Sequence, residues 1–444
     1  MDAREVALLT LNAGERQGSW SDGVLKKQIA AAGLDSRDAG LATQLCFGVI
    51  QNRILLDFYL SKFSNIPLRR LEGKVLQALR LGLYQMLFLT RIPHSAAVDQ
   101  SVALTRAHCK NPRAPGMVNA ILRNLERSLD RLPTIPEDDP AEYYATLYSH
   151  PVWLVRELLE TLGSEGTAAF LQADNSQPPI TAMVNTVKTD LEGALEALQA
   201  EGVHGEPHPW LKNCLVLSRS GSLEELDAFQ NGLFSVQDPA SRLAVLALDP
   251  EPGDRVLDMC AAPGGKSLAA AIQMRDQGEI WSCDLHPHKK TLIQKGAQRL
   301  GLTCIRPQTA DGKVRRPEWE GAFDRVLVDA PCSGLGVIRK KPDIRFKDPE
   351  PLAGLPQVQS AILDNAAGYV KPGGVLVYST CTILERENRA VTDAFLAAHP
   401  EFRRESFLLP GPAGEVSGGQ ITLWPQVHGT DGFYICKLRK DGEA

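Results

Sequence analysis

Short apolar runs alternate with helical patterns over the second half of the chain, and this alternation restricts the possible folds more than any other feature. From about residue 231 the strand-like runs are DRVLDMC, GEIWSCD, TCIRPQTA, FDRVLVDA and GGVLVYST. Helix-like segments such as PHKKTLIQKGAQRLG and LPQVQSAILDNAAGYVKPGG lie between several of them. Buried strands separated by helices are typical of a parallel sheet covered on both faces. We therefore predict a Rossmann-like α/β domain over residues 231–444, with ligands at the carboxyl ends of its strands.

The first 130 residues show almost no strand pattern. Apolar residues recur at spacings of three and four, as in VLQALRLGLYQMLFL (75–89) and GMVNAILRNLERSL (116–129). This spacing predicts a helical bundle. The segment at 75–89 is apolar on nearly all sides, so we expect it to be the central buried helix. The prediction is an all-α domain over residues 1–131.

Between these two regions the sequence predicts a smaller module. LPTIPEDDP (132–140) contains three prolines and a run of acids, which is typical of a linker. Beyond it, HPVWLVRELLETLG reads as a helix, and PITAMVNTV, LEGALEALQAEG and CLVLS read as strand, helix and strand. We predict a small α+β module over residues 141–230.

The composition excludes several classes of protein. A chain of 444 residues with 43% hydrophobic and 23% charged residues is expected to form two or three globular domains. No apolar run reaches membrane-spanning length and no secretory signal opens the sequence, so we expect a cytoplasmic location without membrane contact. Nine cysteines scattered singly predict reduced thiols. The pair His286 and His288 lacks matching ligands nearby, so no metal is expected.

The net charge of −5 is unevenly distributed along the chain. Residues 1–130 contain 17 Lys and Arg against 11 Asp and Glu, whereas the remainder contains 31 against 42. A basic segment of this kind can contact the phosphates of a nucleic acid. A modest excess on a helical surface can equally be a solvated face, and the charge alone leaves both interpretations open.

A turn of small residues marks the predicted ligand site. In RVLDMCAAPGGKS (255–267) a strand is followed by a tight turn and the start of a helix, but the spacing matches neither a dinucleotide fingerprint nor a P-loop. The next three strands are followed by Asp284, Asp311 and Asp329, which we call the strand-end acids. Each alone could be an ordinary loop residue. As a series they favour a ligand with a ribose and a cation but no phosphate, such as S-adenosylmethionine.

Two cysteines also follow strands. Cys332 lies in DAPCSGLG, and Cys381 lies in VLVYSTCTI. A cysteine at a strand end is a candidate nucleophile, and the placement alone does not decide between the two.

Three segments resemble the motifs of RNA (cytosine-5)-methyltransferases. They are CAAPGGK (260–266), DAPCSGLGVIRKKPDIRF (329–346) and YSTCTILERENRAV (378–391). In the helical half, GLYQMLFLTRIPHSAAVDQSVAL and GMVNAILRN look like a NusB-type RNA-binding domain. Along nearly its full length the chain resembles the RsmB (Fmu/Sun) family, which methylates 16S ribosomal RNA.

The resemblance implies a fold and a reaction. The fold would be a NusB-like helical bundle, the small α+β module and a class I S-adenosylmethionine-dependent methyltransferase domain. A methyl group would pass from S-adenosyl-L-methionine to C5 of a cytosine in 16S rRNA, leaving S-adenosyl-L-homocysteine. C5 of cytosine is a poor nucleophile, so a thiolate must first add to C6. The enzyme would act as a monomer on free rRNA or on a partly assembled small subunit.

The resemblance also implies roles for residues. Cys381 would be the nucleophile, Cys332 would assist product release, and Asp329 would hold the base with Lys266 at the same site. The implied cofactor-binding residues are Cys260, Ala261, Ala262, Pro263, Gly264, Gly265, Lys266, Asp284, Asp311 and Asp329. For Cys260 we favour an alternative, a small buried residue that closes the turn.

A basic run follows the second motif. RKKPDIRFK (339–347) has five basic residues and one acid. It could be a solvated charge run, but its position beside the site favours a contact with the RNA backbone. The target base must be unpaired or flipped to reach two thiols in a cleft.

Two other functions remain open from the residues. One is the same chemistry on a transfer RNA. The other is an RNA-binding assembly or antitermination factor without activity, although the presence of both cysteines, the glycine turn and the three acids argues against it.

Overall fold

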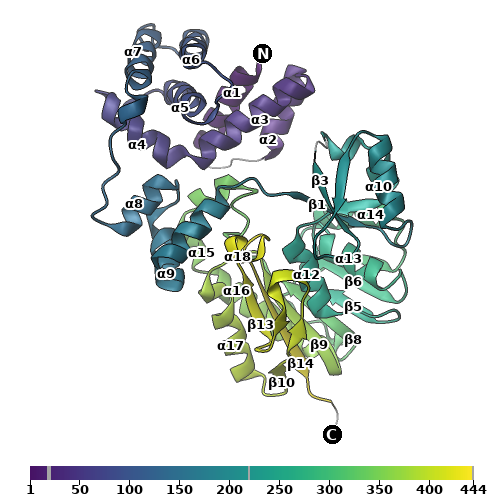
Figure 1. Ribbon diagram of the computed structural model, residues 1–444. Helices are drawn as coiled ribbons and strands as arrows, with labels where there is room; N and C mark the ends of the chain where they lie inside the picture. The colour runs from purple at the N-terminus through teal and green to yellow at the C-terminus, as the bar shows by residue number, and fades with distance from the viewer. Residues whose placement is uncertain (18–21, 219–220, 443–444) are drawn as a thin grey trace. The chain divides into compact units, whose positions relative to one another are not determined.

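The computed structural model describes residues 1–17, 22–218 and 221–442, and the chain forms two compact units (Figure 1). The first unit contains residues 1–176 and also residues 341–347. The second unit contains residues 177–340 and 348–444. A short segment that follows the Cys332 motif in sequence is therefore built into the first unit.

The first unit is helical, as predicted. The helices are α1 (Ala3–Gln17), α2 (Asp22–Ala32), α3 (Ser36–Gln51), α4 (Arg53–Phe63), α5 (Gly73–Phe88), α6 (His94–His108), α7 (Ala114–Glu126), α8 (Pro140–Leu147) and α9 (Val152–Asp174), with 3-10 turns η1 (Leu68–Arg70), η2 (Leu129–Arg131) and η5 (Pro342–Phe346).

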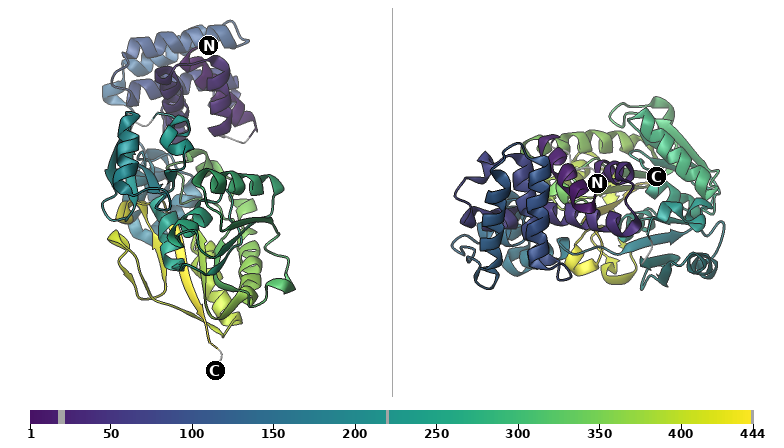
Figure 2. Two further views of the ribbon diagram at one scale, coloured as in Figure 1. Left: turned by 90° about the vertical axis from the view of Figure 1, so that its right-hand side faces the viewer. Right: turned by 90° about the horizontal axis from the view of Figure 1, so that it is seen from above.

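Helix α5 is the central helix of this bundle. All its residues from Val75 to Met86 are buried. It packs against α1, α3, α4, α6 and α7, and the purple and blue helices lie side by side in both views of Figure 2. The all-round apolar pattern of the sequence correctly identified this helix. Helix α9 is interrupted at Gly163, whose φ of 67° breaks it into two helical segments.

The second unit begins with a small antiparallel sheet. Its strands are β1 (Ile180–Val184), β2 (His204–Pro207), β3 (Cys214–Ser218) and β4 (Phe234–Val236), in the order β2-β3-β1-β4. The accompanying helical elements are α10 (Leu191–Ala200), η3 (Leu223–Glu225) and α11 (Asp227–Gln230). Apolar residues of α10 and of the sheet, among them Ala194, Leu198 and Phe234, share one core. A small α+β module is therefore present, but its predicted bounds of 141–230 are wrong: α8 and α9 belong to the first unit, and β4 lies beyond residue 230.

The five strand-like runs form five adjacent strands of the larger sheet. Its strands are β5 (Arg255–Asp258), β6 (Glu279–Asp284), β7 (Ile305–Thr309), β8 (Phe323–Asp329), β9 (Val370–Thr380), β10 (Phe402–Arg404), β13 (Gln420–Leu423) and β14 (Phe433–Lys440). Their order is β10-β14-β9-β8-β5-β6-β7, with β13 against β14. Strands β5 to β9 pair in parallel, whereas β14 is antiparallel to β9. The short strands β11 (Phe407–Leu408) and β12 (Glu415–Val416) pair separately.

Helices cover both faces of this sheet. The elements are α12 (Pro239–Leu248), α13 (Gly265–Gln273), α14 (Pro287–Leu300), η4 (Pro317–Trp319), α15 (Pro349–Leu352), α16 (Leu355–Tyr369), η6 (Glu385–Glu387), α17 (Arg389–Ala398), η7 (Gly411–Ala413) and α18 (Pro425–His428).

Successive residues of a strand belong to different cores. Val256 and Leu327 pack in the core with α12 and α13, whereas Leu257 and Val326 pack in the core with α16 and α17. Figure 1 shows α16 and α17 together along the sheet. This arrangement confirms the doubly covered α/β sheet and places the carboxyl ends of β5 to β8 at one edge. None of the helices that the structure describes combines the length and apolar character needed to cross a membrane.

Candidate active site

The small-residue turn connects β5 to α13 at the carboxyl edge of the sheet. Gly264 has a φ of +111°, a conformation that favours glycine, and α13 begins at the next residue. The backbone N–H of Ala261 donates to the carbonyl of Cys283 at 2.7 Å, and that of Gly264 donates to the carbonyl of Ala261 at 2.7 Å. The first bond ties the turn to β6, and together the two bonds hold its backbone at the carboxyl ends of the strands.

The strand-end acids follow β6, β7 and β8, as predicted from sequence. Asp284 is 6% exposed and accepts a hydrogen bond from the backbone N–H of His286. Asp311 accepts from the backbone N–H of Lys313. Asp329 is the last residue of β8, which pairs directly with β5. The turn therefore lies between the strands that end in Asp284 and Asp329.

Cys260 lies among these acids. Burial, together with the carboxylates of Asp258, Asp329 and Asp284, raises the pKa of the Cys260 thiol well above its ordinary value. Such a thiol is neutral at physiological pH and is not a nucleophile.

Lys266 and Asp329 form an ion pair next to the turn. Lys266 Nζ lies 2.7 Å from Asp329 Oδ2, and the Ser379 hydroxyl donates to Asp329 Oδ1 at 2.8 Å. Burial opposes the charge on Lys266, but the charge and the hydrogen bond of Asp329 outweigh burial and raise the lysine pKa. Lys266 is therefore a fixed cation, held 5.0 Å from the centre of the Phe433 ring.

The two candidate thiols face each other beside this ion pair. Cys332 lies in the loop after β8 (residues 330–336, the PC loop), and Cys381 follows β9 in the TC loop (residues 381–384). Their Sγ atoms are 3.3 Å apart. The hydrogen bond from Cys332 lowers the pKa of Cys381, and the charge of Lys266 adds to this, although burial and Asp329 oppose it. The same bond raises the pKa of Cys332 well above its ordinary value. Cys381 is thus the more readily ionised thiol.

A buried glutamate joins the two loops. Glu387 is fully buried, and its Oε2 accepts from the backbone N–H of Ser333 and from Gln359 Nε2, each at 2.9 Å. The PC and TC loops also bond directly, since the N–H of Gly336 donates to the carbonyl of Cys381 at 3.0 Å. Sequence reasoning noted Glu387 only as part of a motif. Nothing in the sequence around Glu387 indicated that it bridges the two loops.

Asp258 is a second acid that sequence reasoning did not select. Its side chain is 1% exposed and accepts from the Ser267 hydroxyl at 2.7 Å, and Ser282 donates to Ser267 at 2.7 Å. Burial raises the pKa of Asp258 to about 7. Like the strand-end acids it ends a strand, and that shared position is the signal that could have identified it.

Two of the five basic residues in the run after the PC loop are paired with acids. Arg339 Nε lies 2.7 Å from Asp431 Oδ1, and Lys340 Nζ pairs with Asp238 and Asp431. Asp238 lies 102 residues before Lys340 and Asp431 lies 91 residues after it, so a local charge count could not reveal them. For Arg339 and Lys340 the structure supports an internal ion-pair cluster instead of the expected contact with the RNA backbone.

For Arg345 the expected contact is wrong. Its side chain is fully buried within the first unit. Its guanidinium donates to the carbonyls of Gln51 at 2.8 Å and Ser149 at 2.9 Å, and to Asn175 Oδ1 at 3.0 Å. Burial lowers the pKa of Arg345 to about 10. A side chain in this environment cannot reach a phosphate.

The histidine pair forms a stacked contact. The rings of His286 and His288 have centroids 5.6 Å apart. Among the residues that the structure describes, no group of three or more His, Cys, Asp or Glu side chains is arranged to hold a metal ion.

Three family models match the chain. The model of 16S rRNA methyltransferase RsmB/F matches residues 245–439, and the model of the NusB family matches residues 1–127. A model described as an RsmF/B-like methyltransferase, ferredoxin-like domain, matches residues 150–224. The three matched regions follow the order of the bundle, the small sheet and the large sheet.

Curated relatives match over nearly the whole length. A protein of Bacillus subtilis (strain 168) named "Probable ribosomal RNA small subunit methyltransferase B" is 40% identical over 446 residues, covering 99% of both chains. The ribosomal RNA small subunit methyltransferase B of Klebsiella pneumoniae is 34% identical over 413 residues, covering 92% of this chain and 91% of its own. The crystal structure of PH0851 superimposes with a TM-score of 0.81 at 25% identity, covering 99% of both chains.

Proposed function

Because the chain belongs to the 16S rRNA methyltransferase RsmB/F family, we propose that it transfers a methyl group from S-adenosylmethionine to C5 of a cytosine in 16S rRNA, through a covalent bond between Cys381 and C6 of the base. The observation that carries the proposal is the pair of thiols, with Cys381 the more acidic member, next to Lys266 and Asp329.

The residues at the carboxyl edge fit S-adenosylmethionine. S-adenosylmethionine carries a ribose, an adenine and a sulfonium cation, and when bound it supplies an electrophilic methyl group. Asp284 can accept hydrogen bonds from the ribose hydroxyls, as an acid at the end of the second strand does in related sheets. Asp258 Oδ1 is buried and has no hydrogen-bond partner among the described residues, so the site retains an unused acceptor. The turn around Gly264 allows a close approach to the backbone.

Cys381 starts the proposed reaction. Its thiolate adds to C6 of the cytosine, and the electron pair of the C5–C6 double bond makes C5 nucleophilic. Asp329 accepts from the N4 amine and so orients the base, while Lys266 supplies a fixed positive charge beside the reacting thiol. C5 then forms the bond to the methyl carbon, and the methyl–sulfur bond breaks.

Cys332 acts in the last step. After methylation the proton on C5 passes to a solvent water, the C5–C6 double bond forms again, and the bond between Cys381 Sγ and C6 breaks with its electrons going to sulfur. Cys332 is a protonated thiol 3.3 Å from that sulfur. It can donate a hydrogen bond to the departing thiolate and so speed its release.

The test is methyl transfer to purified 16S rRNA from S-adenosylmethionine labelled in the methyl group. After digestion to nucleosides, mass spectrometry should find the label in 5-methylcytidine, and bisulfite sequencing should locate it at one position. The Cys381→Ser variant is the matched control and should transfer no label. Label in another nucleoside would refute C5 chemistry, and label only in transfer RNA would refute the rRNA substrate. Absence of S-adenosylmethionine binding in calorimetry would favour an inactive RNA-binding factor.

A further inference from the structure

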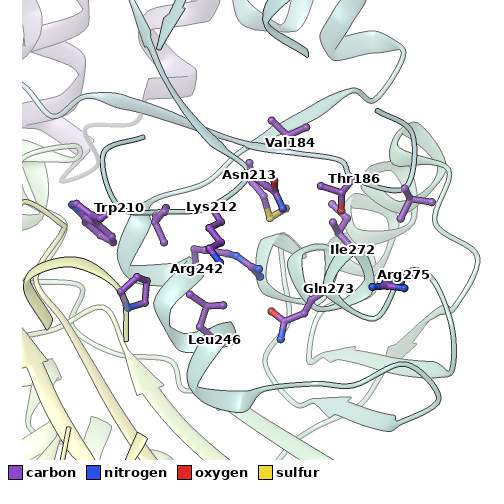
Figure 3. A pocket seen from close by; sticks show the side chains of 14 residues that line it. Val184, Thr186, Trp210, Lys212, Asn213, Arg242, Leu246, Ile272, Gln273 and Arg275 are labelled. Carbon is purple, nitrogen blue, oxygen red and sulfur yellow. The ribbon is translucent and has the colours of Figure 1, made fainter. Parts of the chain in front are cut away.

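A second concave site in the second unit contains none of the residues of the candidate active site. It is a pocket of about 800 Å³ between the small antiparallel sheet and helices α12 and α13 (Figure 3). Its wall combines the end of β1, the loop before β3, one side of α12 and the end of α13. The volume lies within the range of about 300–1,000 Å³ that is typical of ligand pockets.

The charge of this pocket is entirely positive. Within the part of the chain that the structure describes, its lining includes Lys212, Arg242 and Arg275 and no acidic residue. Figure 3 shows Lys212 and Arg242 near the centre, with Arg275 toward one end and Trp210 toward the other. Three cations without an acid give the pocket a positive potential, which attracts an anion.

Arg242 is the most informative of the three cations. Burial lowers the pKa of its guanidinium, so its surroundings disfavour the charge. Among the described residues no carboxylate lies within ion-pair distance of it, and its hydrogen bond to the carbonyl of Ala269 is long, at 3.5 Å. A largely buried guanidinium is normally paired with an anion. The missing partner of Arg242 therefore points to an anionic ligand in the pocket.

Trp210 supplies an aromatic surface at one end. The indole packs against Gly411. A Cβ atom at that position would lie 2.4 Å from the ring, so a residue with a side chain there would clash with the indole. His208 packs edge-on against the same indole, with ring centroids 4.5 Å apart. A fixed aromatic ring beside cations is the combination that binds single-stranded nucleic acid, in which phosphates contact cations and bases stack on aromatic rings.

We infer that this pocket binds one nucleotide unit of the RNA strand, with a backbone phosphate on Lys212 and Arg242 and the adjoining base against Trp210. The inference rests on the proposed function, because it takes RNA as the substrate. It gives the small α+β module a role, since Lys212 and Trp210 belong to that module, whereas Arg242 lies on α12 and Arg275 in the turn after α13 of the larger domain.

The test measures binding of a fluorescent single-stranded 16S rRNA fragment by anisotropy at several salt concentrations. The variants are Arg242→Gln and the double variant Lys212→Gln/Arg275→Gln, whose two residues are exposed. The control is the double variant Lys290→Gln/Lys295→Gln on α14, which removes the same charge elsewhere. Each lost phosphate contact should reduce the slope of log Kd against log salt by about 0.7 and weaken binding about fivefold near 0.1 M salt. Trp210→Leu should weaken binding without changing the slope, and Arg242→Lys should keep most of the slope.

Three outcomes would overturn the inference. The first is a slope in the pocket variants equal to that of the control. The second is binding of inorganic phosphate or AMP at micromolar concentration together with unchanged RNA affinity in the variants, which would assign the pocket to a free small anion. The third is weakened binding of S-adenosylmethionine in Lys212→Gln/Arg275→Gln, which would show an indirect effect on the active site. If the unaltered protein neither binds RNA nor methylates it, the proposed function fails; if it does both while the variants match the control, only the pocket assignment fails.

Discussion

The sulfur atoms of Cys332 and Cys381 lie 3.3 Å apart, on loops that follow two adjacent parallel strands. At this distance one thiol donates and the other accepts, so the two cannot be equivalent. The hydrogen bond lowers the pKa of Cys381 and raises that of Cys332. The charge of Lys266 also lowers the pKa of Cys381, so we expect Cys381 to be the thiol that ionises first.

The first prediction concerns the covalent intermediate. With 16S rRNA, the Cys332→Ser variant should accumulate an RNA adduct that survives denaturing electrophoresis, because a serine hydroxyl is a weaker proton donor to the departing Cys381 thiolate. Cys381→Ser should form no adduct and should transfer no methyl group, because it lacks the nucleophile. RNA carrying 5-fluorocytosine, which cannot lose its C5 substituent, should trap the adduct with the unaltered protein. An adduct that persists in Cys381→Ser and disappears in Cys332→Ser would reverse the two roles.

The second prediction concerns the ion pair beside the thiol. Lys266→Met removes a positive charge that lowers the pKa of Cys381, so that pKa should rise. Asp329→Asn removes a negative charge that raises it, so the pKa of Cys381 should fall. The measurement is the rate of Cys381 alkylation by iodoacetamide against pH, followed by peptide mass spectrometry. Lys295→Met on α14 is the control and should leave the curve in place. Shifts in the same direction for Lys266→Met and Asp329→Asn would contradict the electrostatic explanation.

The third prediction concerns Glu387, a positioning residue that acts through the two loops. Glu387→Ala removes the carboxylate that accepts from the N–H of Ser333 and from the amide of Gln359, which then keeps only the carbonyl of Pro331. Removing a buried acceptor of this kind costs about 1–3 kcal/mol. The PC loop should loosen, and the pKa of Cys381 should rise toward its ordinary value as the bond from Cys332 weakens. Glu387→Gln retains one oxygen and should recover part of the effect. The measurement is the rate of Cys381 alkylation by iodoacetamide against pH. If the variant unfolds more easily but the pKa of Cys381 is unchanged, Glu387 contributes to stability and does not position the thiols.

The large sheet could be predicted from sequence because most of its parallel strands, apart from the edge strand β7, are largely buried on both faces. Each of the five apolar runs forms a strand of this sheet. Apolar strands separated by helices are buried when they form a parallel sheet that the helices cover on both faces. The same logic placed Asp284 and Asp329 at one edge, because parallel strands end at the same edge.

Long-range polar contacts could not be predicted. Arg345 lies in a run of charges that looks solvated, yet its hydrogen-bond acceptors come from Gln51, Ser149 and Asn175, more than 150 residues earlier. The partners of Glu387 likewise lie 28 and 54 residues away. Hydrophobic periodicity reports which side of an element is covered, but it does not report which distant polar group meets another.

The fourth prediction concerns pH and the buried Asp258. In the folded protein its pKa is about 7, whereas an unfolded aspartate has a pKa of about 3.9. Between these values the folded state holds the proton and the unfolded state has lost it, so stability should fall as pH rises from about 4 to 7, by up to about 4 kcal/mol. Asp258→Asn should flatten this decline in thermal unfolding of the second unit, whereas the exposed control Glu196→Gln should retain it. A decline of the same size in Asp258→Asn would show that another group causes it.

The fifth prediction concerns Arg345 and the segment that the first unit incorporates. Arg345→Met removes the guanidinium N–H groups that donate to the carbonyls of Gln51 and Ser149. The loss of charged hydrogen bonds in a buried site should cost about 3–5 kcal/mol of folding stability. Hydrogen exchange measured by mass spectrometry should therefore show faster exchange at the end of α3 and around residues 148–150, with β5 to β8 unchanged. Lys341→Gln, an exposed change in the same segment, should leave exchange at all these sites unaltered. Equal exchange in Arg345→Met and Lys341→Gln would mean that the buried guanidinium contributes nothing to the stability of the first unit.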